Sequence, residues 1–191
     1  MAQKSARDRI LTTAGELFYA KGYQATGINE IIERSGVAKA TFYAQFPSKE
    51  DLCLAYVRHM DDSYFTVISS WVQRQATPLG RFMSIIHGSE EWLRATDFKG
   101  CGFLNLVPEI VDAANPIRKV SQEHYETFRQ LLERLSRELI DSDLERYGHL
   151  TAGELAHDYL SVFTGAISLS ALYHDAWPVE KAGQTIERLL K

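Results

Sequence analysis

The chain has 191 residues, of which 45% are apolar and 24% are charged, and these proportions are ordinary for a folded globular protein. Its two cysteines, Cys53 and Cys101, are too few for a secreted disulfide framework, so we expect a reducing, cytoplasmic location. The N-terminal MAQKSARDRI lacks the apolar run of a signal peptide, and no stretch reaches the ~18 apolar residues of a membrane span. We therefore expect no membrane partner.

The net charge of -4 is distributed unevenly along the chain. Residues 1–59 contain eight basic and six acidic side chains, whereas the remainder contains 13 basic and 19 acidic ones. An acidic body repels phosphate and leaves only the N-terminal part free to approach a nucleic acid. A protein that coats DNA without sequence preference should be basic over most of its surface, so the composition argues against that class.

Apolar residues recur at helical spacing and strand-like alternation is nearly absent, which predicts an all-α fold. The first helix is expected over about residues 5–20, closed by Gly22. A short helix from Ile28 to Arg34 follows, with Thr26 as its expected cap. A third helix is expected from Lys39 to Gln45, where a Phe-Pro pair ends it.

Ser48 and Asp51 form the sequence pattern of a capping box at the start of a long helix over about 48–72. Later helices are expected at about 79–95, 100–113, 116–140, 152–173 and 178 to the end. The predicted domains are a helix-turn-helix domain over residues 1–47 and a larger helical effector-binding and dimerisation domain over 48–191. Helix 48–72 would bridge the two.

The segment Ile28–Phe46 has the anatomy of a helix-turn-helix, with Gly36 in the turn where a positive φ is needed. In its second helix, Ala40 and Ala44 are small enough to allow close approach to a DNA groove. Gln45 can read an adenine edge, and the neighbouring polar side chains can bind phosphates. A generic pair of short helices in a bundle explains this periodicity equally well.

The run LFYAKGYQATGINEIIERSGVAKATFYAQFPSKEDL resembles the DNA-binding domain of TetR-family repressors, and the resemblance is dense over residues 10–56. It implies a sequence-specific transcriptional regulator, most often a repressor that a small-molecule effector releases from a near-palindromic operator. It implies neither an enzyme nor a cofactor, and the sequence carries no nucleophile elbow, phosphate loop or dinucleotide fingerprint.

The resemblance also implies roles for single residues. Tyr43 and Lys49 would contact phosphates, and Thr26 would contact one through its amide or hydroxyl. Gly27 departs from the family pattern, which commonly has serine or threonine there, and Gln45 stands where many members have histidine. The DNA-contacting residues expected from the resemblance are Thr26, Lys39, Ala40, Thr41, Tyr43, Gln45 and Lys49.

By the same resemblance, the last two helices would pack against those of a second subunit. Independently, the segment 155–173 is apolar nearly all round, so it must be covered on both sides. A central core helix of a monomer is the alternative. A twofold dimer would place two recognition helices ~34 Å apart on a near-palindromic operator. The expected interface residues are Leu155, Tyr159, Val162, Phe163, Ala166, Leu169 and Leu172.

The middle helices are expected to enclose a pocket for an unknown effector, because aromatic side chains line pockets for small apolar ligands. Each of these side chains can equally be explained as core filling. The candidates are Trp71, Trp92, Cys101, Phe103, Tyr125 and Phe128.

Cys101 lies in a Lys-Gly-Cys-Gly segment similar to one that opens the sixth helix in one branch of the family. Some members of that branch sense electrophiles or oxidants through this cysteine, so redox sensing is the alternative function. A helix N-terminus and Lys99 would both stabilise a thiolate there. A buried, inert thiol is the competing interpretation. No pair of histidines has the spacing of a zinc site, and we expect no metal.

Overall fold

The computed structural model describes residues 4–191, and within this range the regular elements are all helical. The predicted all-α fold is confirmed. The chain divides into two compact units that interleave along the sequence. The first unit extends to Ser63 and also contains Gly102–Glu123; the second contains Tyr64–Cys101 and His124–Lys191. This division differs from the single boundary after residue 47 that the sequence suggested.

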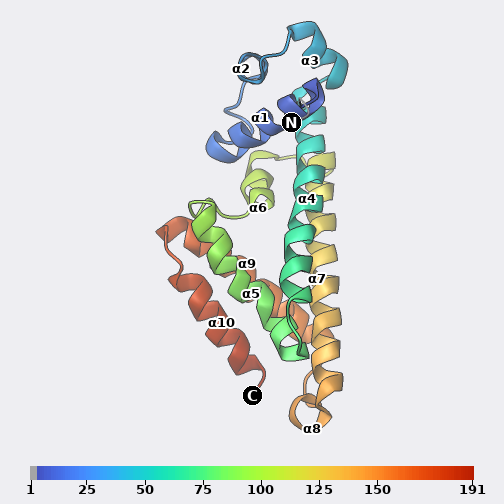
Figure 1. Ribbon diagram of the computed structural model, residues 1–191, viewed down its shortest axis with the longest axis vertical. Coiled ribbons are helices and arrows are strands. Elements are labelled where there is room, and N and C mark those ends of the chain that lie inside the picture. Colours follow the sequence, from blue (N-terminus) through green and yellow to red (C-terminus); the bar gives the residue numbers. More distant parts are fainter. Residues whose placement is uncertain (1–3) are drawn as a thin grey trace. The chain divides into compact units, whose positions relative to one another are not determined.

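The first unit begins with four helices: α1 (Ala6–Lys21), α2 (Ile28–Ser35), α3 (Lys39–Gln45) and the start of α4 (Lys49–Gln73). Helix α1 packs against both α2 and α3 (Figure 1). The apolar stripe expected for the first helix is buried, which agrees with its helical spacing. Buried side chains of this unit include Ile10, Ala14, Leu17, Phe18, Ile31 and Phe42.

Local sequence signals set the helix starts in this unit. The amide of Asp8 donates to Ser5 Oγ at 3.1 Å, and the amide of Asp51 donates to Ser48 Oγ at 3.0 Å. Both serines therefore satisfy a backbone N–H that the first helical turn leaves open. The capping role predicted for Ser48 is confirmed.

The second stretch of the first unit contains α6 (Gly102–Leu106), a 3₁₀ turn (Val107–Glu109) and the start of α7 (Pro116–Ser142). The single helix expected over about 100–113 is wrong, because regular helix ends at Leu106. Proline at 108 has no N–H to donate and its ring crowds the carbonyl one turn earlier, so the helix tightens and stops.

The second unit contains α5 (Pro78–Ala95), α8 (Leu144–Tyr147), α9 (Ala152–Tyr173) and α10 (Trp177–Leu189), together with the later parts of α4 and α7. Helix α10 packs against α9 and α5 (Figure 1). Of the described helices, none combines the length and apolarity needed to cross a membrane.

Tyr159 lies at the centre of the second unit and is fully buried. Its hydroxyl oxygen accepts the backbone N–H of Ile86 at 2.9 Å, and its ring packs edge-on against Phe82 with centroids 5.0 Å apart. Burial raises the pKa of the Tyr159 hydroxyl well above its ordinary value. This contact ties α9 to α5 inside one protomer.

Candidate nucleic-acid interface and ligand cavity

Helix α3 presents a polar and small-residue face to solvent. Phe42 is fully buried and its ring meets that of Tyr43 edge-on at 5.3 Å, so the apolar side of the helix is anchored in the unit. Tyr43 itself is 42% exposed. Thr41 is half-buried, whereas the exposed candidate residues of this helix are Lys39, Ala40, Tyr43 and Gln45.

The turn between α2 and α3 depends on Gly36, which adopts φ 63° and ψ 37°. The Gly36 amide donates to the carbonyl of Glu33, and the Val37 amide donates to that of Ile32 at 3.4 Å. This pair of bonds is a Schellman motif, which caps the end of α2 and directs the chain into α3. The requirement for glycine predicted at this turn is therefore confirmed.

Thr26 does not have the exposure that a phosphate contact requires. Its side chain is fully buried, its hydroxyl donates to the Gly22 carbonyl at 2.7 Å, and its amide donates to the Tyr23 carbonyl at 3.3 Å. The N-cap of α2 is Gly27, in extended conformation and without a side-chain cap. The expected capping role of Thr26 is wrong, because the tight turn after α1 draws its hydroxyl inward.

Lys49, expected on a phosphate, is instead held by the loop between α1 and α2. Its ammonium donates to the carbonyls of Tyr23 at 3.0 Å and Thr26 at 3.1 Å, and lies 4.4 Å from the centroid of the Tyr23 ring. A third, longer contact of 3.5 Å reaches the Gln24 carbonyl. These contacts occupy the donors of the ammonium, so Lys49 organises the loop in this structure.

Two side chains near this interface had no role in the sequence analysis. The Arg7 guanidinium lies over the Phe46 ring at 4.9 Å from its centroid. The Glu109 carboxylate accepts the amide of Tyr23 at 3.0 Å and that of Gln24 at 2.7 Å. Glu109 and Tyr23 are 86 positions apart, and no local sequence signal connects residues at that separation.

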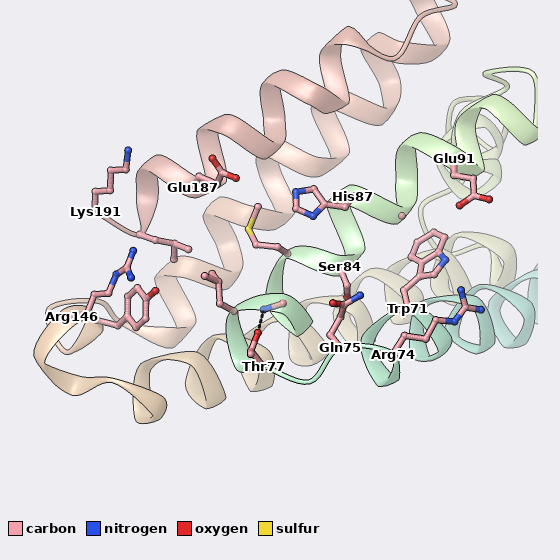
Figure 2. A pocket seen from close by; sticks show the side chains of 16 residues that line it. Trp71, Arg74, Gln75, Thr77, Ser84, His87, Glu91, Arg146, Glu187 and Lys191 are labelled. Carbon is pink, nitrogen blue, oxygen red and sulfur yellow. Dashed lines mark hydrogen bonds between the residues drawn. The ribbon is translucent and has the colours of Figure 1, made fainter.

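The second unit contains a cavity of about 690 Å³ lined by α5 and the ends of α4, α8 and α10 (Figure 2). This volume lies within the range of small-molecule sites. The Trp71 ring packs so closely on Gly88 that a Cβ there would lie 2.5 Å from Trp71 Cδ2. Charged side chains at the rim are Arg74, Glu91, Arg146, Glu187 and Lys191.

Of the six expected effector residues, only Trp71 lines this cavity. Phe103 and Phe128 are buried core residues of their units, and Phe128 meets Phe163 edge-on at 5.3 Å. Trp92 is half-buried against the core of the second unit. These aromatic side chains fill interior space because large apolar rings gain most from burial.

Cys101 is half-buried, and its sulfur accepts a hydrogen bond from the Tyr125 hydroxyl at 3.3 Å. Burial and the neighbouring thiol raise the pKa of Tyr125 far above its ordinary value. The other cysteine, Cys53, is buried, and burial raises the pKa of its thiol to about 12. Among the described residues, no cluster of three or more potential metal ligands occurs.

The expected dimer residues separate into two groups on α9. Leu155, Tyr159, Phe163 and Ala166 are buried within the protomer, so their assignment to an intersubunit surface is wrong. They face the chain's own core. Leu169 and Leu172, by contrast, are 42% and 74% exposed, and Val162 is half-buried.

Two aromatic side chains next to this exposed part of α9 extend its apolar surface. Tyr173 and Trp177 are 57% and 42% exposed, and their ring centroids lie 5.3 Å apart. Exposed apolar side chains gathered in this way mark interaction surfaces more often than isolated ones do.

A buried Phe42, a Schellman turn at Gly36 and an exposed polar face on α3 together define a helix-turn-helix DNA-binding protein. Residues 10–56 match the family model described as bacterial regulatory proteins, tetR family. Residues 78–186 match the tetracyclin repressor-like C-terminal domain. The chain belongs to the tetR family of bacterial regulatory proteins, which are DNA-binding transcriptional regulators and generally not enzymes.

Similar proteins cover the whole chain or its DNA-binding part. The HTH-type transcriptional regulator LmrA of Bacillus subtilis is 26% identical over 193 residues, which is 100% of both chains. The HTH-type transcriptional activator FasR of Mycolicibacterium smegmatis is 44% identical over 57 residues, covering 29% of this chain and 26% of FasR. The crystal structure of SCO4454, a TetR-family transcriptional regulator from Streptomyces coelicolor, superposes with a TM-score of 0.87 at 26% identity, covering 97% and 94% of the two chains.

Proposed function

We propose that this protein is a homodimeric repressor that binds a near-palindromic operator and that a small-molecule effector releases. The observation that carries the proposal is the exposed face of α3, set at a fixed angle by the turn at Gly36. A rigid helix with small and polar side chains can enter the major groove and contact bases and phosphates together.

The structure redistributes the DNA roles among the candidate residues. Lys39, Thr41 and Tyr43 are proposed to contact phosphates, while Ala40 leaves room for the helix to approach the groove. Gln45, exposed at the end of α3, is proposed to read a base edge. In this assignment, Thr26 and Lys49 support the loop before α2 and do not contact DNA.

A second copy of the chain is the proposed occupant of the exposed apolar part of α9. Leu169, Leu172 and the adjoining Tyr173 and Trp177 supply its exposed apolar side chains. A twofold interface there uses the same patch on both subunits and produces paired recognition helices. The family's regulators typically form such homodimers.

The cavity of the second unit offers a site for the effector. It combines the apolar surfaces of Trp71 and Met83 with the polar rim formed by Arg74 and Glu187 (Figure 2). Such a lining suits a small molecule with an apolar body and a polar or charged end. The effector would act by binding better to the DNA-incompetent state.

Operator selection from random duplexes, with the purified full-length protein, tests the DNA-binding part of the proposal. We expect a near-palindromic consensus sequence. Gln45→Ala should change the preferred base at one symmetric position more than it changes the affinity. Selection that yields no consensus sequence would falsify specific regulation.

A compound screen on the protein–operator complex then tests release. Hits should dissociate the complex and quench tryptophan fluorescence. The quenching should be reduced in Trp71→Phe but retained in Trp177→Phe, because only Trp71 lines the cavity. Hits whose quenching is insensitive to Trp71→Phe would contradict the assignment of the effector to this cavity.

The direction of regulation needs its own measurement, because blocking or recruiting polymerase depends on where the operator lies. A reporter placed behind the selected operator should be silenced by the protein and restored by the effector. Increased expression on adding the protein would instead make it an activator.

Electrophile or oxidant sensing through Cys101 is the second candidate function. The favouring observation is that this thiol is half-buried and accepts a hydrogen bond from Tyr125, whereas Cys53 is fully enclosed. Iodoacetamide should alkylate Cys101 faster than Cys53 and weaken operator binding. Equal modification rates, or undiminished operator binding after alkylation, would exclude sensing.

A further inference from the structure

Glu109 holds the loop between α1 and α2 through three hydrogen bonds. Its carboxylate accepts the amides of Tyr23 at 3.0 Å and Gln24 at 2.7 Å, and its backbone carbonyl accepts the Gln24 side-chain amide at 3.0 Å. Bonds that a carboxylate accepts are stronger than neutral ones. The approach is close, because a Cβ on Gly22 would lie 2.9 Å from the Glu109 carboxylate.

The same loop is held from a second element by Lys49. Glu109 accepts its N–H groups, whereas the Lys49 ammonium donates to its carbonyls at Tyr23 and Thr26. Side chains of opposite charge thus pair with the backbone polar groups that the end of α1 leaves open. The loop ends at Gly27, the N-cap of α2, so its geometry sets where the helix-turn-helix begins.

The segment that carries Glu109 is itself anchored within the first unit. Arg118 at the start of α7 donates to the carbonyls of Val107 at 3.3 Å and Ile110 at 2.9 Å. Asn115 donates to the Glu50 carboxylate at 2.5 Å, and its own side-chain oxygen caps α7. Residues 107–115 therefore form a strap, and Glu109 is the residue through which it holds the α1–α2 loop.

We propose that Glu109 is a positioning residue for DNA binding, holding the α1–α2 loop in the geometry that lets α3 enter the groove. In the chain, the stretch that contains the strap follows directly on Cys101 of the second unit. A change that withdraws the strap removes all three bonds together. This inference rests on DNA binding by the family and does not depend on effector release.

The test compares Glu109→Ala and Glu109→Gln with Val111→Ala in the full-length protein. Val111 lies on the same strap and is 92% exposed, so its truncation controls for a change in the strap alone. Operator affinity is measured at several salt concentrations, and amide hydrogen exchange is followed at Tyr23 and Gln24. All measurements are made well below the unfolding midpoint of each variant.

Glu109→Ala should weaken operator binding roughly tenfold, because a smaller fraction of molecules holds the binding-competent geometry. The dependence of affinity on salt should stay as in the wild type, since no phosphate contact is lost. Exchange at Tyr23 and Gln24 should accelerate, and Glu109→Gln should fall between the two proteins. Val111→Ala should behave as the wild type.

Wild-type affinity in Glu109→Ala, or unchanged amide protection, would overturn the proposal. A reduced salt dependence would also overturn it, by showing that phosphate contacts were lost. If Glu109→Ala does not fold, Gln24→Ala removes only the side-chain bond to the Glu109 carbonyl. It should then give a smaller loss of affinity in the same direction, and no loss would count against the proposal.

Discussion

The Lys49 ammonium lies 3.0 Å from the Tyr23 carbonyl oxygen and 4.4 Å from the centroid of the Tyr23 ring. One cation thus satisfies a backbone acceptor and covers an aromatic face at the same time. Burial raises the pKa of the Tyr23 hydroxyl to about 12, and nearby Cys53, Glu50 and Glu109 contribute to this rise. The phenol therefore stays neutral beside Lys49 at ordinary pH.

Lys49→Met should weaken operator binding without changing its salt dependence, because the lost contacts lie inside the protein. A side chain bound to phosphate behaves differently: its removal lowers the slope of log K against log salt by about 0.9. Lys39→Met is the matched comparison, since Lys39 is exposed on α3, and it should lower the slope. An equal reduction of slope in both variants would return Lys49 to the phosphate contacts.

Tyr43→Phe should weaken operator binding by about 1.5 kcal/mol, the lower end for a hydrogen bond to a charged group. The Phe42–Tyr43 ring contact survives the change, so the free energy of unfolding should stay the same. Fluorescence anisotropy with labelled operator and urea denaturation measure the two quantities. A loss of stability without a loss of affinity would make Tyr43 a packing residue only.

Gly27→Ser should stabilise the first unit by a few tenths of a kcal/mol, the usual difference between serine and glycine at an N-cap. A Cβ at position 27 meets nothing within 4 Å, and the backbone there is extended, so no strain opposes the change. Operator binding should tighten if the new hydroxyl reaches a phosphate. Thermal unfolding and anisotropy test both effects, and Gly36→Ser is the control, because φ 63° should make serine destabilising there.

Leu172→Glu should convert the dimer into monomers, because Leu172 is 74% exposed on the proposed interface and a charge there would be desolvated. Sedimentation velocity measures the change, and half-site binding should remain while binding to the full operator weakens. A dimer that persists in Leu172→Glu would place the interface elsewhere.

Tyr159→Phe is the comparison within the same helix. It should leave the oligomeric state unchanged and lower the free energy of unfolding by about 1 kcal/mol, because the buried Ile86 N–H loses its acceptor. Dissociation of the dimer in this variant would contradict the burial of Tyr159 within one protomer.

Cys53 should make the protein sensitive to alkaline pH. Burial raises the pKa of its thiol from 9.0 to about 12 in the folded protein. Between these values the folded state retains a proton that the unfolded state loses, so the free energy of unfolding should fall as pH rises through this window. Urea midpoints at pH 8 and pH 10 measure the fall, which should be smaller in Cys53→Ala. An equal fall in both proteins would assign the effect to other groups.

The sequence by itself determined the helix-turn-helix, because its signals are local. The period of apolar residues, the glycine at 36 and the Ser48–Asp51 pair each act within a few positions. The third helix lies at Lys39–Gln45, as expected. The family followed from the same stretch, since its pattern is dense over residues 10–56.

Only the tertiary structure decided what the polar side chains around that motif do. Lys49 and Thr26 have the identities of DNA contacts, yet the loop after α1 engages both of them internally. On α9, the apolar pattern could not separate the core side, with Tyr159, from the exposed side, with Leu172. Glu109 acts across more than eighty positions, where only the folded chain brings its carboxylate to the loop.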